Sequence, residues 1–261
     1  MSLYDRYVLP RLTNLACGSK PTRRQREKIV HRAYGDVLEI GFGGGLNLEH
    51  YDAKKVRKVF GLEPSEGMRE SARARVEASG LDVELIDLPG EQIPLDDNSV
   101  DSILVTYTLC TIPDAVEALQ GMRRVLKPKG HLFFCEHGKS PDAAVQKWQQ
   151  RVNPVWRRFA GGCNMDRDIP ALLNAGGFTI EEDNRMYIPG LTPGYAILDE
   201  NFVSRGFGAT PRYVTGGREV QWARRRAEGQ QALYYRAVIF ADAERRGEDT
   251  TPPLPSSPLL S

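Results

Sequence analysis

Short apolar runs alternate with segments of helical periodicity between residues 36 and 140 of the chain. Five of these runs are only four to six residues long, which suits strands that are buried on both faces. The predicted strands are Asp36–Gly41, Lys58–Leu62, Val83–Ile86, Ser102–Thr106 and His131–Cys135. Between them, Met68–Ala78 and Ala115–Leu126 place their apolar residues on one side of a helix. Strands that alternate with helices predict right-handed crossovers, a parallel sheet and an α/β fold.

Local signals support the boundaries of these helices. Ser65 before an acidic residue and Asp114 after a proline are typical of helix N-termini. A further helix is expected to begin near Leu46, directly after a glycine-rich turn. Residues 128–130 (Pro-Lys-Gly) are expected to close the helix before them and to turn the chain into the next strand.

The first 32 residues predict two different helical segments. Residues 1–16 place leucines and tyrosines at roughly helical spacing, although Pro10 lies in the middle. Residues 20–32 hold six Lys or Arg residues against the single acid Glu27, and Pro21 suits a first helical turn. Such a charged run usually forms a solvated helix face, which is the simpler interpretation. The alternative is an interfacial segment that contacts anionic lipid.

The chain changes character after the predicted parallel strands. Residues 142–177 are expected to be helical, with Trp148 and Trp156 as apolar anchors, and Phe178–Ile188 is expected to be a further strand. Lysine does not occur after Lys147, whereas arginine becomes frequent. The Pro- and Ser-rich end of the chain predicts disorder.

The strand Phe178–Ile188 needs a partner, because a buried strand without one leaves backbone groups unpaired. Gly194–Phe202 and Ala232–Ala241 are the two candidates for an antiparallel last strand. We prefer Ala232–Ala241, which is richer in β-branched and aromatic residues. Residues 195–230 would then be an insertion at the rim of the sheet, with aromatic residues available to a substrate.

The stretch VLEIGFGGGLNL, residues 37–48, contains the strongest candidate for a ligand site. A predicted strand that carries Glu39 runs into a loop with Gly41, Gly43 and Gly45, and such glycines let a backbone approach a ligand closely. A dinucleotide fingerprint needs glycine at its sixth position, which here is Leu46. Glu39 would repel a pyrophosphate but attract an ammonium, such as the one on the amino-acid end of S-adenosylmethionine.

Two further acids follow at positions that suit a nucleoside. Glu63 ends the second predicted strand, 22 positions after Gly41, where an acid bonds ribose hydroxyls in doubly wound nucleoside-binding folds. The simpler interpretation of Glu63 is a carboxylate that favours the dipole of the next helix, and both roles are compatible. Glu91 precedes the fourth strand, where a polar side chain can meet an adenine edge, and Met68 can pack on the ring.

Composition narrows the class of protein. The 261 residues suffice for one large α/β domain, and 41% hydrophobic with 26% charged residues is an ordinary soluble mixture. The formal net charge of +1 disfavours bulk binding of nucleic acid. No apolar run reaches the roughly 20 residues of a membrane span, and the N-terminus lacks the pattern of a secretory signal.

The four cysteines are far apart and form no CxxC pair. They are Cys17, Cys110, Cys135 and Cys163. This spacing argues against a disulfide framework and against a metal site, and it favours a reducing, cytoplasmic location.

Four motifs in this order resemble those of the class I S-adenosylmethionine-dependent methyltransferases. They are VLEIGFGGG, GLEPSEGM, GEQIPLDDNSVDSILVTYTLCTIPD and EALQGMRRVLKPKGHLFFCEHG, over about residues 36–140. The segments TLCTIPD, FFCEHG and WQQRVNPVWRRFAGGCN resemble those of the branch that contains the animal thiol methyltransferases of the methyltransferase-like 7 type. They extend the resemblance to about residue 190. The resemblance implies a doubly wound, mostly parallel seven-stranded sheet with helices on both faces.

The resemblance also implies a domain organisation. Residues 1–34 would form a helical lid, residues 35–190 the cofactor-binding core, residues 191–243 an insertion with the last strand, and residues 244–261 a disordered tail.

The family's cofactor site is carried over onto matching positions of this sequence. It falls on Glu39, Gly41, Gly43, Gly45, Glu63, Glu91 and Thr106. The ribose-binding acid is commonly Asp in the family, whereas here it is Glu63. The Asp that many relatives place two residues before the Glu91 position is Pro89 in this chain, and Asp87 is out of register.

The acceptor side is expected where strands four and five end. Thr106, Tyr107 and Cys110 follow strand four, and Glu136 and His137 follow strand five. A neutral His137 can take a proton from a thiol, a hydroxyl or an amine, although it can equally serve only to hold the loop. Buried packing is the simpler interpretation of the cysteines.

These observations predict a methyltransferase that acts on a small acceptor of the thiol, lipid or quinone class. No nucleic-acid substrate is expected, because the residues after strand four are not the Asn-Pro-Pro-aromatic signature of amino-methylating enzymes. Peripheral membrane contact through the N-terminal segment is an alternative to a purely cytoplasmic location, and the oligomeric state stays open. A nucleotide-dependent oxidoreductase and a non-catalytic cofactor-binding relative are the rival interpretations.

Overall fold

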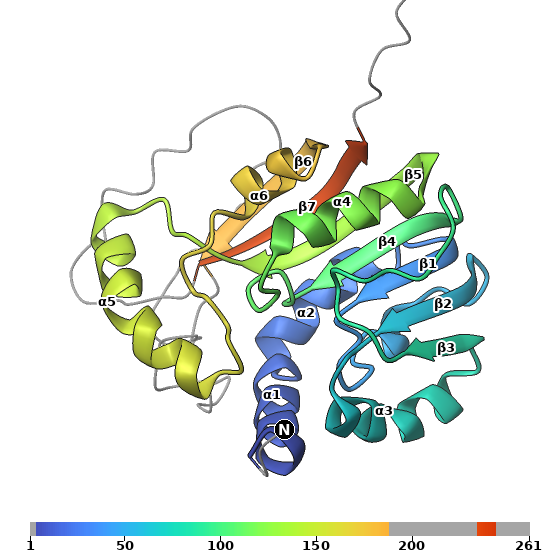
Figure 1. Ribbon diagram of the computed structural model, residues 1–261, viewed down its shortest axis with the longest axis horizontal. Helices are drawn as coiled ribbons and strands as arrows, with labels where there is room; N and C mark the ends of the chain where they lie inside the picture. Colours follow the sequence, from blue (N-terminus) through green and yellow to red (C-terminus); the bar gives the residue numbers. More distant parts are fainter. Residues whose placement is uncertain (1–3, 188–233, 244–261) are drawn as a thin grey trace, which may run out of the picture.

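A seven-stranded sheet runs through the computed structural model, which describes residues 4–187 and 234–243 (Figure 1). The strand order is β3-β2-β1-β4-β5-β7-β6. The strands are β1 (Gly35–Ile40), β2 (Val56–Leu62), β3 (Val83–Ile86), β4 (Val100–Thr106), β5 (Leu126–His137), β6 (Phe178–Tyr187) and β7 (Tyr234–Ala243). Strands β1 to β5 pair in parallel, whereas β7 is antiparallel to both β5 and β6. The predicted doubly wound α/β fold is therefore confirmed.

Helices cover both faces of this sheet. α4 (Ala115–Val125) and α6 (Ile169–Ala175) lie together on one face, in front of the sheet in Figure 1. α2 (Lys20–Val30), the 3-10 helix η2 (Leu48–His50) and α3 (Glu66–Ser79) contribute to the core of the opposite face. α1 (Leu9–Cys17), which follows the π-helix η1 (Tyr4–Val8), and α5 (Ala143–Phe159) stand beyond the carboxyl ends of the central strands.

The alternation of side chains along each strand creates the two cores. Leu38 and Ile103 are buried under α4, whereas their neighbours Val37 and Leu104 are buried on the side of α2 and α3. Because both faces of the central strands are covered, their sequences are continuously apolar. Polar exceptions occur at both ends of these strands. Glu39 and Thr106 are buried near the carboxyl ends, and Ser102 is buried near the start of β4.

Local capping explains why two of the predicted helices begin where they do. The Ser65 side chain accepts a hydrogen bond from the Met68 backbone, and Asp114 accepts one from the Glu117 backbone. The helix predicted to begin near Leu46 is wrong, since the chain forms only the 3-10 turn η2 there. The turn directs Asn47 and Tyr51 toward Glu39, an arrangement that replaces a regular helix.

Two predicted boundaries also need correction. The helical stretch at residues 142–177 is divided into α5 and α6, because Gly161 and Gly162 both adopt positive φ after α5. The Pro-Lys-Gly turn at residues 128–130 lies inside β5 as an irregularity, between the pairing of Val100 with Leu126 and that of Ser102 with His131.

The predicted last strand is confirmed. β7 overlaps the preferred segment Ala232–Ala241 and pairs with Phe134–His137 on one side and with β6 on the other. The rival segment Gly194–Phe202 lies outside the described residues, as do most of the predicted insertion and the predicted disordered tail.

Candidate active site

The glycine loop after β1 has a backbone that only glycine adopts at low cost. Gly41, Gly43 and Gly45 have φ angles of +71°, +57° and +74°. A Cβ on Gly41 would overlap the Thr108 side chain, and one on Gly43 would lie 3.2 Å from the methyl carbon of Met68. The loop is therefore a bare backbone surface with Met68 beside it.

Glu39 is the centre of a buried polar network next to this loop. Only 1% of its surface is exposed, and its two oxygens accept hydrogen bonds from Asn47 Nδ2 at 2.8 Å and from the Tyr51 hydroxyl at 2.6 Å. Burial raises the pKa of Glu39 to about 7, although the hydrogen bonds from Tyr51 and Asn47 oppose the rise. The carboxylate keeps lone pairs for a further donor, because each of its oxygens can accept two hydrogen bonds.

Arg26 of α2 joins this network from the basic segment. Its Nη1 donates to Asn47 Oδ1 at 2.8 Å and to Thr106 Oγ1 at 2.6 Å. Its guanidinium lies 4.8 Å from the centre of the Tyr107 ring. The predicted solvated face is therefore wrong for this side of α2, which buries Thr22, Gln25, Arg26, Ile29 and Val30.

Glu63 follows β2 and faces the glycine loop. Its Oε2 accepts the Gly43 backbone N–H at 2.9 Å, and its Oε1 accepts the Ser65 backbone N–H at 2.9 Å. Burial raises the pKa of Glu63, and the two backbone donors act in the opposite direction. The Glu63 carboxylate therefore bridges the glycine loop and the start of α3.

The other acids of the predicted adenine region have different partners. Glu91 accepts the backbone N–H of Asp114 at 3.2 Å, so it lies at the start of α4. Asp87 is 67% exposed and forms a bidentate pair with Arg69. The Asp87 carboxylate is therefore engaged by Arg69 at the surface.

Thr106 and Tyr107 end β4 in different environments. Thr106 Oγ1 accepts from Asn47 Nδ2 at 3.0 Å as well as from Arg26, which ties β4 to the Glu39 network. Tyr107 has a φ of +55°, a conformation that non-glycine residues adopt chiefly at constrained sites. Its hydroxyl accepts a hydrogen bond from the Cys135 thiol at 3.3 Å.

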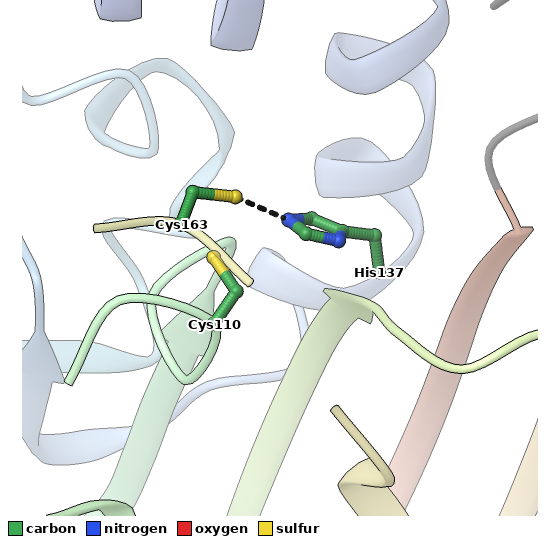
Figure 2. A group of neighbouring side chains, drawn as sticks. All are labelled: Cys110, His137 and Cys163. Carbon is green, nitrogen blue, oxygen red and sulfur yellow. Dashed lines mark hydrogen bonds between the residues drawn. The ribbon is translucent and has the colours of Figure 1, made fainter. Parts of the chain in front are cut away.

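Two cysteines and a histidine converge beyond β4 and β5, as Figure 2 shows. Cys110 comes from the loop after β4, His137 is the last residue of β5, and Cys163 follows α5. Their ligand atoms all lie within 4.8 Å of one another, and Cys163 Sγ is 3.2 Å from His137 Nε2. The sequence argument that the cysteines are too far apart to form a cluster is therefore wrong.

The electrostatics of this Cys110–His137–Cys163 cluster favour a thiolate on Cys163. A hydrogen bond from the Cys110 thiol lowers the pKa of Cys163 against the effect of burial, and the His137 ring lowers it further. Burial lowers the pKa of His137, but contact with Cys163 outweighs it and the net direction is upward. The cluster thus holds polarised sulfur and nitrogen atoms in a largely buried place.

Hydrogen bonds to backbone carbonyls hold the three segments together. Asn164 donates to the Cys110 carbonyl through both its backbone nitrogen and its Nδ2, each at 2.9 Å. Arg167 Nη1 donates to the carbonyls of Leu109 and Ile112. Gln149 of α5 donates to the Gly138 carbonyl, next to His137, at 3.0 Å.

Comparison with known proteins decides the family. Residues 38–134 match a family model described as a methyltransferase domain. Thiol S-methyltransferase TMT1B of Homo sapiens is 33% identical over 136 residues, which are 51% of this chain and 55% of that protein. Demethylmenaquinone methyltransferase of Listeria monocytogenes is 36% identical over 165 residues, or 60% and 62% of the two chains. Residues 38–134 therefore match a methyltransferase domain, and the relatives named above are methyltransferases.

The fold of the methyltransferase domain is also found in solved structures. The structure of geranyl diphosphate methyltransferase in complex with SAM has a TM-score of 0.58 at 14% identity, over 85% of this chain and 86% of that one. The matches to the two curated relatives span less than two thirds of either protein's length.

A second family model, inactive transglutaminase fused to 7 transmembrane helices, matches residues 180–261. The described part of this match consists of most of β6 and all of β7, which complete the sheet of the methyltransferase domain. None of the helices in residues 4–187 combines the length and apolar character that a membrane crossing requires.

Most of the residues predicted from the sequence meet around the glycine loop of the methyltransferase domain. Glu39, Glu63, Met68 and Thr106 lie there, whereas Glu91 is at α4, Tyr107 is under Arg26 and His137 is in the cysteine cluster. Arg26, Asn47 and Tyr51 were not predicted as site residues. Arg26 had a usable signal, because Thr22, Arg26 and Ile29 have the spacing of one helix face.

Proposed function

We propose that this chain transfers the methyl group of S-adenosylmethionine to the sulfur of a small thiol, with other small apolar acceptors such as quinols or lipids as the broader class. The observation that carries this proposal is a polarised histidine at the end of β5, His137, at the same edge of the sheet as the glycine loop. The similarity to thiol S-methyltransferase TMT1B supports the thiol.

The cofactor fits the residues around the glycine loop. Gly43 and Gly44 present no side chain where the amino-acid end would lie, and Glu39 offers a carboxylate for its ammonium. Glu63 at the rim would accept from the ribose hydroxyls, and Met68 would pack on the adenine, with Glu91 toward its edge. Asn14 of α1 places an oxygen against Gly44 that is buried without a hydrogen-bond partner among the described residues, so this helix would meet the bound cofactor.

The chemistry asks little of the protein besides alignment and desolvation. The bound cofactor supplies a methyl group on a sulfonium that is already activated as a leaving group. The protein must hold the acceptor in line with that bond and exclude water. In this scheme His137 accepts the thiol proton. Thr106 is held in place by its hydrogen bonds with Asn47 and Arg26, and Tyr107 contacts the acceptor.

The oxidoreductase alternative is disfavoured by two residues. Leu46 stands where a dinucleotide fingerprint requires glycine, and Glu39 would lie close to a pyrophosphate. The non-catalytic alternative predicts cofactor binding without turnover and needs an experiment.

A transfer assay with methyl-labelled cofactor over thiols, quinols, phospholipids and amines tests the proposal. We expect label on thiols and a rate that climbs as the pH rises toward about 8.5, because the thiolate is the nucleophile. Glu39→Ala serves as the control that weakens cofactor binding. Tight binding of S-adenosylhomocysteine without transfer to any acceptor would favour a binding module, and NAD binding instead would end the proposal.

We also propose that the N-terminal helices contact a membrane surface or an apolar acceptor. Leu12 and Leu15 of α1 are 50% and 67% exposed, and Phe159 at the end of α5 is 63% exposed. The Tyr4 hydroxyl donates to the Phe159 carbonyl at 2.8 Å, so the two apolar surfaces adjoin. Exposed large apolar groups that gather in this way favour an interfacial contact.

Flotation of the chain with anionic vesicles tests this contact. We expect the chain to bind the vesicles and Leu15→Ser to weaken that binding. Val155→Ser, one turn before Phe159 in α5, is a second variant that tests the same exposed apolar surface. If the chain does not bind the vesicles even at low salt, the N-terminal helices serve only as a lid over the site. Removal of residues 1–16 would then weaken acceptor binding but not cofactor binding.

A further inference from the structure

We propose that Cys110, His137 and Cys163 form a zinc site with one open position, and that this position binds the sulfur of the acceptor. The second half of this proposal rests on the proposed thiol methylation, whereas the first half does not. It also changes the assignment of His137 from a proton acceptor to a metal ligand.

The geometry of the cluster suits a tetrahedral ion. Zinc lies about 2.3 Å from sulfur and about 2.0–2.1 Å from imidazole nitrogen, so its ligand atoms are about 3.5–3.8 Å apart. The three ligand atoms lie within 4.8 Å of one another, and the Cys163–His137 contact is 3.2 Å. Shifts below about an ångström would bring all three to tetrahedral distances.

The chemistry of the donors selects the metal. Two sulfurs and one imidazole nitrogen favour zinc over the hard cations magnesium and calcium, which require oxygen. Figure 2 shows Cys163 directed at the His137 ring, with Cys110 beside it. The burial of Cys110 and His137 fits a site that holds its ion away from bulk water.

The scaffold around the cluster resembles the support that metal ligands need. Asn164 holds the Cys110 carbonyl through two hydrogen bonds, and the Cys163 backbone N–H donates to Ala160, which fixes the turn after α5. Arg167 holds the Leu109 carbonyl beside Cys110. Each ligand therefore sits on a segment whose backbone is anchored, as pre-organised sites require.

Three protein ligands leave a fourth position for a substrate, which is the pattern of catalytic rather than structural zinc sites. The acceptor thiol would bind there as a thiolate, and its proton would pass to water. Its sulfur then bonds to the methyl carbon of the cofactor while the bond from that carbon to the sulfonium sulfur breaks, and the electron pair stays on the cofactor sulfur. Both products are neutral thioethers, which are weaker metal ligands than thiolates and can leave.

Titration of the reduced full chain with cobalt(II), a spectroscopic substitute for zinc, tests the metal site. We expect about one ion per chain with thiolate-to-cobalt charge-transfer absorption, displaced by zinc. Cys110→Ser, Cys163→Ser and His137→Ala should each weaken binding about tenfold or more, since even the loss of outer-shell support costs that much. Cys135→Ala is the matched control, because Cys135 is a buried cysteine that bonds Tyr107 instead.

Binding of S-adenosylhomocysteine by each variant shows whether it is folded. A reduced wild-type chain without thiolate-to-cobalt absorption overturns the proposal, as does absorption that all three ligand variants retain.

The open position is tested by adding a small alkyl thiol to the cobalt-loaded chain. We expect the charge-transfer absorption to gain intensity in wild type and in Cys17→Ala alike. Cys17→Ala is included because Cys17 interacts electrostatically with Cys163 and is another thiol that could close the site. An unchanged spectrum, or a response only in Cys17→Ala, overturns the open position. If thiol methylation survives chelation and the Cys163→Ser change, the metal has no activating role, but the proposed function stands. If the chain binds metal but methylates no acceptor, the proposed function is overturned and the metal site stands.

Discussion

The cofactor half and the acceptor half of this site are built in different ways. Around the cofactor, Glu39 lies in the same strand–loop unit as its partners Asn47 and Tyr51, a few residues further along the chain. On the acceptor side, Cys110, His137 and Cys163 come from three segments, and the two that touch are 26 positions apart. The direct partners of Glu39 are therefore local, whereas the cysteine cluster requires the whole sheet and α5.

Both halves combine hydrogen-bonded buried polar atoms with unsatisfied ones. Both oxygens of Glu39 have donors, and Arg26 links Asn47 to Thr106. Glu136 Oε1 accepts from the backbone of Thr108 and Leu109, but its Oε2 is buried without a hydrogen-bond partner among the described residues. An unsatisfied buried acceptor costs free energy. Both halves hold one, because Asn14 Oδ1 beside Gly44 is also buried without a hydrogen-bond partner among the described residues.

The largest expected effect comes from Gly41→Ala, which breaks the cofactor half at its backbone. Gly41 has a φ of +71° and its Cβ would overlap Thr108, whereas Gly80 has a φ of +68° and nothing within 4 Å. Gly80→Ala should lower the free energy of unfolding by about 1–2 kcal/mol from φ strain alone. Gly41→Ala should cost about 1–3 kcal/mol more through overpacking.

Denaturant unfolding of the two alanine variants measures this difference. Equal losses would mean that the loop relaxes around the added methyl group, and the close approach of the loop to Thr108 would then have no role in stability.

A somewhat smaller effect is expected from Arg26→Met. This change removes the donor that links Asn47 to Thr106, and hydrogen bonds to charged groups contribute about 1.5–3 kcal/mol. Arg24→Met is the control, because Arg24 lies on the exposed side of the same helix. If the two variants unfold at the same denaturant concentration, α2 acts as the solvated helix that its charge suggests.

The difference between the halves explains what could be predicted from the sequence. Strand periodicity and the glycine loop are local signals, so the order of β1 to β5, the position of Glu39 and that of Glu63 followed from the printed residues. The last strand was also predictable, because β-branched and aromatic residues marked its segment. A Cys–His cluster has no such local pattern, since its members meet only after β4, β5 and α5 have packed.

Two errors have the same physical origin. A run of six basic residues does not show which of them is buried, because the partners of Arg26, Asn47 and Thr106, are far away in the sequence. The helix-face spacing of Arg26 with Thr22 and Ile29 is the one local signal of its burial. A helix after the glycine loop is the usual outcome, but here Tyr51 must reach Glu39, and a tight turn achieves that where a helix would not.

Glu39→Ala should weaken binding of S-adenosylhomocysteine without abolishing the fold. Loss of one charge-assisted hydrogen bond to the ammonium costs about 1.5–3 kcal/mol, or about tenfold to a hundredfold in affinity. Isothermal calorimetry measures this change, with Glu49→Ala as a control at an exposed acid in η2. Equal affinity in both variants would remove Glu39 from the cofactor site and leave it only a partner of Asn47 and Tyr51.

The smallest effect is a pH dependence of cofactor affinity that Glu39 imposes. Burial raises the pKa of Glu39 to about 7, with Arg26 lowering it and Glu63 raising it slightly, so the carboxyl group is mostly protonated at pH 6 in the free protein. An ammonium ligand needs the ionised form, and affinity for S-adenosylhomocysteine should therefore rise about tenfold from pH 6 to pH 8.

The folded pKa lies above the ordinary value of 4.5, so Glu39 holds its proton more tightly in the folded chain. Its contribution to the stability of the free protein must then fall as the pH rises from about 4.5 to about 7 and level off above that. Calorimetry and thermal unfolding of the wild type and Glu39→Gln over this range measure both trends, and a Glu39→Gln variant that keeps the wild-type slope would place the titrating group elsewhere in the site.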